Sequence, residues 1–125
     1  MDKFFTVSFP GGKKVDANYE ELTIHTDQPV KEGGEGSAPE PFTLFLASIA
    51  TCAGIYALEF CNERGISTDG LALNMSAMQN DASKLFDRVV LKLTLPSGFP
   101  EKYKKAILKA VDLCTVKKHI MNPPR

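Results

Sequence analysis

The longest uncharged stretch of the chain, residues 41–58, constrains the fold more than any other feature. Pro41 suits the first turn of a helix, where its missing N–H costs nothing, and Gly65 supplies a stop beyond the polar end. Apolar side chains surround the helix axis instead of forming one stripe, and such a helix must be covered on every side. The stretch just reaches membrane-spanning length, but the polar Thr51 within it and the amphipathic segments around it favour a buried helix. The sequence therefore predicts a central core helix.

Period-two alternation of apolar and polar residues marks strands on both sides of this helix. The strand-like segments are residues 5–9, 15–19, 22–25, 71–77 and 89–95. Residues 28–40 carry glycines and prolines with little apolar content and predict a long loop. After Pro100 an amphipathic pattern predicts a last long helix. The order β-β-β-α-β-β-α indicates one α+β domain over residues 1–125, with a mostly antiparallel sheet and helices against one face.

Packing and charge together limit the partners of the chain. One sheet and one amphipathic helix are too few to cover the central helix, so a second copy should complete its burial and we expect a homodimer. The 15 basic residues balance the 15 acidic ones and no block of like charge stands out, which argues against nucleic acid and membrane as partners. The N-terminus shows no signal-peptide pattern, so we expect a cytoplasmic protein.

Cysteine is the strongest candidate nucleophile, because the chain has no nucleophile elbow, phosphate loop, dinucleotide fingerprint or Cys-x-x-Cys pair. Three cysteines in the cytoplasm should be thiols, and their odd number argues against a framework of structural disulfides. Cys52 lies mid-helix among small residues that would let a substrate approach the sulfur. Cys61, nine residues later, points to the opposite side of the helix and should be a small buried hydrophobe. The same inert role is the alternative for Cys52.

Cys114 stands at the end of the last amphipathic segment, where a short further helix should begin. Unpaired N–H groups at a helix N-terminus lower the pKa of a thiol, so we expect Cys114 to ionise readily. The basic residues 117–119 add positive charge, although they fit an ordinary solvated face equally well. A metal site of Cys52, Cys114 and His119 has no ligand pair at zinc spacing, and His25 has no evident partner. We therefore predict neither metal nor cofactor.

Three parts of the chain together resemble the signature of the OsmC/Ohr family: a glycine-bearing loop, a buried helix around Cys52 and a later site at Cys114. The matching segments read Gly33-Gly34-Glu35-Gly36-Ser37-Ala38-Pro39-Glu40-Pro41-Phe42, Leu44-Phe45-Leu46-Ala47-Ser48, Ala50-Thr51-Cys52 and Cys114-Thr115-Val116. The separation of about sixty residues between the two cysteines also fits. The resemblance covers nearly the whole chain, including the order of strands and helices.

This resemblance implies an OsmC-like fold, an intertwined homodimer and a cysteine-based peroxidase in oxidative stress defence. By motif, Cys52 is the implied peroxidatic residue, which attacks the O–O bond of an organic hydroperoxide and becomes a sulfenic acid. Cys114 is the implied resolving residue, which condenses with the sulfenic acid to form a disulfide. A dithiol reductant would then complete the cycle.

The chain departs from the family's peroxidases directly after the proline that opens the helix. Phe42 stands there in place of a glutamate that orients a catalytic arginine, and Glu40 is the nearest carboxylate that could substitute. The family's arginine comes from the first hairpin, where this chain has only Lys13 and Lys14. A lysine is a point charge and cannot reproduce a bidentate guanidinium, and an apolar setting should raise the pKa of Cys52. These departures favour an alternative function, the binding of a small hydrophobic or thiol-reactive ligand without turnover.

Overall fold

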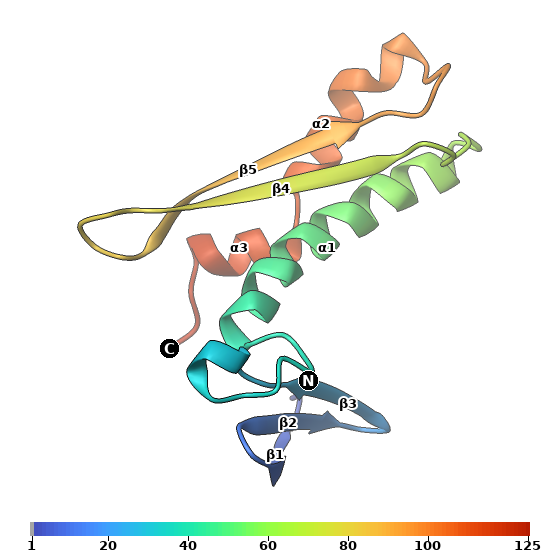
Figure 1. Cartoon of the computed structure of the whole chain (residues 1–125). Helices are drawn as coiled ribbons and strands as arrows, with labels where there is room; N and C mark the ends of the chain where they lie inside the picture. The colour runs from blue at the N-terminus through green and yellow to red at the C-terminus, as the bar shows by residue number, and fades with distance from the viewer. Residues whose placement is uncertain (1) are drawn as a thin grey trace. The chain divides into compact units, whose positions relative to one another are not determined.

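The strands and helices of the chain follow the predicted order in the computed structural model, which describes residues 2–125 (Figure 1). The strands are β1 Thr6–Gly11, β2 Lys14–Tyr19, β3 Leu22–Thr26, β4 Ala72–Gln79 and β5 Phe86–Thr94. The helices are α1 Pro41–Glu63, α2 Lys104–Asp112 and α3 Thr115–Met121, with 3-10 turns at Val30–Glu32 and Glu101–Tyr103. The α+β class is confirmed, as is the short helix after Cys114. The last long helix begins later than predicted, because a 3-10 turn follows Pro100.

By their internal contacts these elements group into two compact units, one up to Phe45 and one from Leu46 onward. The first unit holds the antiparallel sheet β1-β2-β3, and the second holds the antiparallel pair β4-β5. We expected one mostly antiparallel sheet, and within the described residues there are two. The 23 residues of α1 separate β3 from β4 along the chain, and no ladder joins strands of the two units in residues 2–125. A single domain over residues 1–125 stays a prediction.

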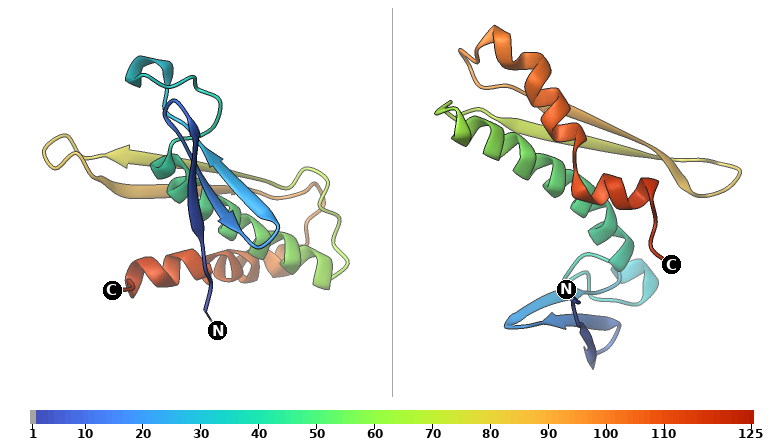
Figure 2. Two further views of the ribbon diagram at one scale, coloured as in Figure 1. Left: turned by 90° about the horizontal axis from the view of Figure 1, so that it is seen from below. Right: turned by 180° about the vertical axis from the view of Figure 1, so that it is seen from behind.

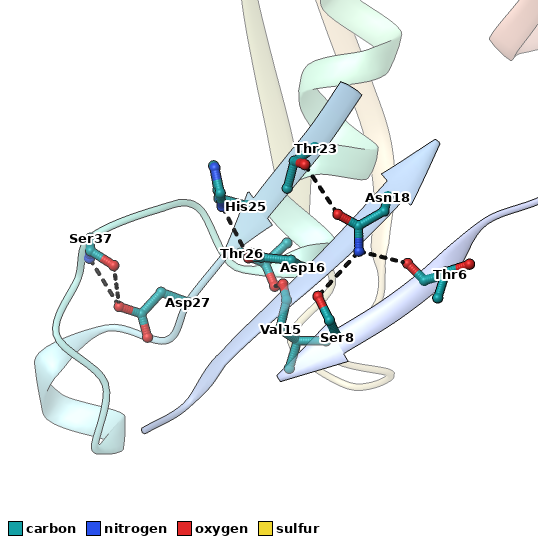
Figure 3. Close-up of polar contacts among 10 residues, drawn as sticks. All are labelled: Thr6, Ser8, Val15, Asp16, Asn18, Thr23, His25, Thr26, Asp27 and Ser37. Carbon is teal, nitrogen blue, oxygen red and sulfur yellow. Dashed lines mark hydrogen bonds and ion pairs between the residues drawn. The ribbon is translucent and has the colours of Figure 1, made fainter. Parts of the chain in front are cut away.

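The three-stranded sheet has one polar face and one apolar face, as its period-two alternation predicts. On the polar face the Asn18 side-chain amide donates to the Thr6 carbonyl and to the Ser8 hydroxyl, both at 3.1 Å, as Figure 3 shows. The hydroxyl of Thr23 donates to the amide oxygen of the same asparagine at 3.1 Å. The apolar face carries Val7 and Ile24 from the two outer strands, and both side chains are exposed in this chain.

The loop between β3 and α1 is organised around the carboxylate of Asp27, which is 1% exposed. This carboxylate accepts the Ser37 hydroxyl at 2.6 Å and the backbone N–H groups of Gln28, Glu35 and Ser37 at 2.8, 3.3 and 3.1 Å. These bonds, with the Ser37 hydroxyl foremost, lower the pKa of Asp27 to about 2. Gly34 is required in the same loop, because a Cβ there would lie 2.0 Å from the Gln28 carbonyl oxygen. The predicted loop is therefore a well-bonded structure.

The second unit has its core between α1, the β4–β5 hairpin and α2, which Figures 1 and 2 show lying against one another. Buried core residues are Ala53, Ala57, Phe60, Cys61, Phe99, Ile107 and Val111. The amphipathic α2 contributes the fully buried Ile107, while its lysines face outward, as its sequence pattern predicts. Cys61 is fully buried in this cluster, which confirms its expected role as a small core residue.

Helix α1 is covered on one face only within this chain. Ala53, Ala57 and Cys61 lie in the core, whereas Ile55 and Leu58 are 45% and 37% exposed. We expected burial on every side, and one hairpin and one amphipathic helix do not provide it. By length and hydropathy α1 could also cross a membrane, but this is weak evidence because core helices pass the same test.

Candidate functional site

Cys52 lies near the middle of α1 and is half-buried. The neighbouring Ala53 is fully buried, while a Cβ added at Gly54 would meet no atom within 4 Å. One side of the helix at this level is therefore packed into the core, and the other is open in this chain. The sulfur thus lies at the boundary between core and solvent, where a small molecule could reach it.

Cys114 is brought to the same place by the end of α2 and the start of α3. It is the N-cap residue of α3 and is 3% exposed. Its carbonyl accepts the N–H of Lys118 at 3.1 Å, which closes the first turn of the helix. The N–H groups of Thr115 and Val116, which the helix itself leaves unpaired, are free to bind a side chain.

The thiols of Cys52 and Cys114 lie within hydrogen-bonding distance of each other, although 61 residues of chain separate them. Both are free thiols in the structure. The sulfur of Cys52 also accepts hydrogen bonds from the backbone N–H groups of Val116 and Thr115. The two cysteines that the sequence singled out are therefore neighbours, and a disulfide between them would need little movement.

The shared hydrogen bonds divide the two thiols into a more acidic and a less acidic one. Burial acts to raise the pKa of Cys52, but the N–H of Val116, the S–H of Cys114 and the N–H of Thr115 together lower it below its usual value. Burial raises the pKa of Cys114, and so does its role as donor to the Cys52 sulfur. Cys52 is therefore the more acidic thiol of the pair and Cys114 the less acidic one.

Two expectations from the sequence are wrong on this point. We expected the N-terminus of α3 to lower the pKa of Cys114. The N–H groups of Lys117 and Val116 do act in that direction, but burial and the hydrogen bond to Cys52 outweigh them, and the pKa of Cys114 is raised. We also expected an apolar setting to raise the pKa of Cys52, and the hydrogen bonds outweigh burial there. The side-chain charges of the basic residues 117–119 are not among the causes of either shift, and the Lys117 ammonium pairs with Asp112. The backbone N–H of Lys117 does act to lower the pKa of Cys114.

The remaining predicted catalytic residues, Lys13, Lys14 and Glu40, belong to the first unit. The Lys14 ammonium forms an ion pair with the Glu35 carboxylate at 2.9 Å, and this hydrogen-bonded pair raises the pKa of Lys14. Glu40 precedes α1, and its carbonyl accepts the N–H of Leu44 at 3.3 Å. The lysine's carboxylate partner is thus Glu35, which our sequence reasoning missed as a candidate. Its position inside the glycine-bearing loop opposite the first hairpin was the signal that could have found it.

The first unit also contains a hollow of about 330 Å³ beside the polar face of its sheet. Its lining residues are Pro10, Lys14, Asp16, His25, Thr26, Ser37 and Ala38. The imidazole Nδ1 of His25 lies 3.1 Å from the carboxylate of Asp16, as Figure 3 shows. His25 therefore has a partner, contrary to our reading of the sequence. The His25 ring is largely exposed, whereas Asp16, in the central strand β2, is buried.

No group of three or more His, Cys, Asp or Glu side chains is arranged to hold a metal ion anywhere in residues 2–125. The imidazole of His119 does not join the two cysteines, because its Nδ1 lies 2.8 Å from the Thr115 carbonyl in the previous turn of α3. The set Cys52, Cys114 and His119 is therefore not assembled as a metal site. What the second unit does assemble is a reduced, asymmetric pair of thiols.

Comparison with known families places most of the chain in one of them. The sequence model of the family described as OsmC-like protein matches residues 34–125, which include both cysteines of the pair. This match crosses the boundary between the two units. A comparison with curated proteins finds no match.

Solved structures with the same fold extend the likeness to the N-terminal strands. A Psychrobacter arcticus protein, provisionally assigned to osmotic stress and detoxification responses, has a TM-score of 0.74 at 22% identity, covering 91% of this chain and 85% of its own. The OsmC-like protein of Mycoplasma pneumoniae has a TM-score of 0.73 at 16% identity, covering 98% and 89%. An organic hydroperoxide resistance protein from Legionella pneumophila has a TM-score of 0.63 at 19% identity, covering 96% and 89%. At these identities the likeness establishes the fold alone.

Proposed function

The chain belongs to the OsmC-like protein family, and from this membership and its thiol pair we propose that it is a thiol-dependent peroxidase for organic hydroperoxides. The observation that carries the proposal is the hydrogen-bonded pair of Cys52 and Cys114, in which the pKa of one thiol is lowered and that of the other raised. A peroxidatic cysteine must be a thiolate, and a resolving cysteine must wait beside it. The Legionella relative's name, organic hydroperoxide resistance protein, agrees with this activity.

In the first step the Cys52 thiolate attacks one oxygen of the peroxide O–O bond. The S–O bond forms as the O–O bond breaks, so the sulfur becomes a sulfenic acid and the alkoxide leaves, taking up a proton to become an alcohol. The N–H groups of Thr115 and Val116 stabilise the attacking thiolate.

In the second step the sulfur of Cys114 attacks the Cys52 sulfenic acid. An S–S bond forms and the hydroxyl leaves as water, which takes up the proton that Cys114 loses. A dithiol reductant then exchanges with the disulfide, and both thiols are restored as the reductant becomes oxidised. The raised pKa of Cys114 suits this order, because a protonated resolving thiol does not compete with Cys52 for the peroxide.

The catalytic roles of Lys13, Lys14 and Glu40 stay predictions. Of the two lysines, Lys14 is the better candidate, because its ion pair with Glu35 at 2.9 Å orients the ammonium. In this proposal Glu35 replaces Glu40 as the orienting carboxylate. A lysine–glutamate pair lacks the bidentate geometry of an arginine fork, so we expect slower turnover than an arginine would give.

A second candidate function is the binding of a small hydrophobic or thiol-reactive ligand without turnover. The rings of Phe42 and Phe45 stack at 5.7 Å between centroids, and each residue is 46% exposed. This aromatic surface at the start of α1 stands where the family's peroxidases carry a charged orienting residue. It favours apolar ligands whether or not the thiols react.

We also propose that the protein works as a homodimer in the cytoplasm. The supporting observation is the exposure of apolar side chains on α1, such as Ile55 and Leu58, and on the apolar face of the first sheet. So many exposed apolar side chains within each unit favour a partner surface that covers them. Sedimentation equilibrium of the full chain tests this, and a concentration-independent mass of one chain would contradict it.

The peroxidase proposal is tested by intact mass after addition of one equivalent of cumene hydroperoxide. We expect the wild type to lose two hydrogens as a Cys52–Cys114 disulfide, and Cys114→Ser to accumulate a sulfenic acid on Cys52 that dimedone traps. Cys52→Ser should not react, and Cys61→Ser is the control that should behave as wild type because Cys61 is buried in the core. If the wild type stays fully reduced while saturably binding the hydroperoxide or its alcohol, ligand binding replaces catalysis as the function.

A further inference from the structure

A side-chain hydrogen bond joins α1 to α3 beside the thiol pair. The hydroxyl of Tyr56 lies 3.0 Å from the hydroxyl of Thr115, across 59 residues of sequence. Thr115 belongs to the Cys114-Thr115-Val116 motif, whereas Tyr56 lies outside every motif by which the site was recognised. The bond has no part in the redox chemistry itself, so its position needs another explanation.

Each residue of this bond is close in sequence to one of the two reacting cysteines. Tyr56 follows Cys52 by four residues, so the two side chains lie on the same face of α1, one turn apart. Thr115 directly follows Cys114, and its own backbone N–H is one of the two that bind the Cys52 sulfur. The bond therefore fixes the residue that carries a thiolate-stabilising N–H to the helix that carries the thiolate.

Few other side-chain contacts hold α3 in this place. The helix has seven residues, none of them buried, and its outer side chains Ile120 and Met121 are exposed. The ion pair of Lys117 with Asp112 ties α3 to the end of α2, but both partners are largely exposed and such pairs contribute little. A short exposed helix frays readily, so the Tyr56–Thr115 bond adds a side-chain anchor to α1 beside the Thr115 and Val116 N–H groups on the Cys52 sulfur.

We propose that Tyr56 is a positioning residue, which holds the first turn of α3 over Cys52 so that the Thr115 and Val116 N–H groups and the Cys114 thiol face the Cys52 sulfur. This inference deepens the proposed function, since it rests on Cys52 as the reacting thiol. It concerns the reduced protein before any peroxide binds. Among the described residues, the one titratable side chain that shifts the pKa of Cys52 is Cys114, and no lysine, histidine or carboxylate contributes.

The proposal predicts that removing the Tyr56 hydroxyl lowers the thiolate fraction of Cys52. In Tyr56→Phe the ring and its packing remain, but the first turn of α3 is free to move away from the sulfur. The rate of Cys52 alkylation at neutral pH should then fall about two- to tenfold, the range that one hydrogen bond supplies. The pH profile of alkylation should shift to higher pH by the logarithm of this factor, about 0.3 to 1 pH unit.

The experiment measures the alkylation rate of Cys52 by iodoacetamide from pH 5 to 10, with the Cys52 peptide quantified by mass spectrometry of the full chain. The variants are Tyr56→Phe, Thr115→Val and the double variant, with Thr115→Ser as the variant that keeps a hydroxyl. Tyr103→Phe is the matched control, because it removes a phenol hydroxyl from the 3-10 turn before α2 instead of the thiol pair. Circular dichroism confirms that each variant is folded.

If Tyr56 acts as proposed, the two single variants and the double variant share one shifted profile, because each breaks the same bond. Thr115→Ser and Tyr103→Phe keep the wild-type profile. A wild-type profile in Tyr56→Phe would overturn the proposal, and so would additive effects of the two single variants. The assay uses no peroxide, so a protein that fails to reduce hydroperoxides but shows the shared shift loses the proposed activity and keeps this inference.

Discussion

Each of the two units binds one acidic side chain through backbone N–H groups, but the consequences differ. In the first unit the Asp27 carboxylate is held by three backbone N–H groups and one hydroxyl, and its pKa is lowered to about 2. In the second, the Cys52 sulfur is held by two backbone N–H groups and one thiol, and its pKa is also lowered. In both cases backbone N–H groups of a turn or helix start favour the anionic form of the side chain.

The difference between them lies in what remains open. Asp27 is 1% exposed and all its donors belong to one loop, so it can only hold that loop together. Cys52 is half-buried, and one of its donors is the thiol of Cys114, which can itself form a covalent bond. Backbone amides therefore build structure where the anion is enclosed, and prepare chemistry where it is accessible and faces a second reactive group.

The largest effect on this comparison is expected from replacing Gly34, the glycine that lets the Asp27 loop close. In Gly34→Ala the new Cβ would lie 2.0 Å from the Gln28 carbonyl oxygen, a backbone atom that cannot yield without opening the loop. We expect the melting temperature to fall by more than about 10 °C, by the usual effect of overpacking on a small protein. Thermal unfolding followed by circular dichroism measures it.

Gly54→Ala is the matched control in the second unit, because its Cβ meets no atom within 4 Å in this chain. Alanine is the better helix former, so the variant should be as stable as wild type or slightly more so. Equal losses in the two variants would contradict the difference between the two sites. A loss confined to Gly54→Ala, together with dissociation, would indicate that a second copy packs closely on that face.

A smaller effect is expected from neutralising Asp27 itself. The pKa of this carboxyl is lowered on folding, so its ionised form stabilises the fold above its usual pKa of 3.8, and that contribution is lost as the pH falls toward 2. Asp27→Asn should therefore melt well below wild type at pH 7, and the two melting curves should converge between about pH 4 and pH 2. Asp81→Asn, in the exposed turn of the β4–β5 hairpin, is the control. A difference that stays constant across this range would show that the charge of Asp27 does not matter.

The smallest expected effect separates the thiol donor of the Cys52 site from the two backbone donors. Cys114→Ala removes the S–H donor and should slow alkylation of Cys52 at pH 7 about three- to tenfold, because one hydrogen bond to the Cys52 sulfur is lost. Cys114→Ser keeps a donor and should stay close to wild type. Iodoacetamide kinetics on the Cys52 peptide measure both variants. Equal rates in all three proteins would mean that the amides of α3 act alone.

Much of this molecule is predictable from its sequence because the signals are local. Period-two alternation located the strands, and the uncharged stretch from residue 41 located α1. The prediction that Gly65 ends α1 is also confirmed. Gly65 adopts φ +65°, and the N–H of Ile66 donates to the Cys61 carbonyl at 2.9 Å. Residue type and motif singled out Cys52 and Cys114 before any contact between them was known.

Other features were not predictable, because they depend on pairs distant in sequence. Glu35 and Lys14 meet only when the loop folds back on the first hairpin, and nothing in either segment alone names the other. The pairing of His25 with Asp16 arises from the register of β2 and β3. The division into two sheets depends on which strands pair with each other. The alternation of residues within one strand does not determine this pairing.

The sequence by itself determined the order of elements and the two thiols available for chemistry, because hydrophobic period and residue type are properties of the local chain. Only the tertiary structure decided which of the two has the lowered pKa. Cys114 is the N-cap residue of α3, yet its pKa is raised, whereas N–H groups from the same helix start help to lower the pKa of Cys52, because a pKa responds to the direction of donors in space. That direction is set by how α3 lies on α1, about sixty residues away in the chain.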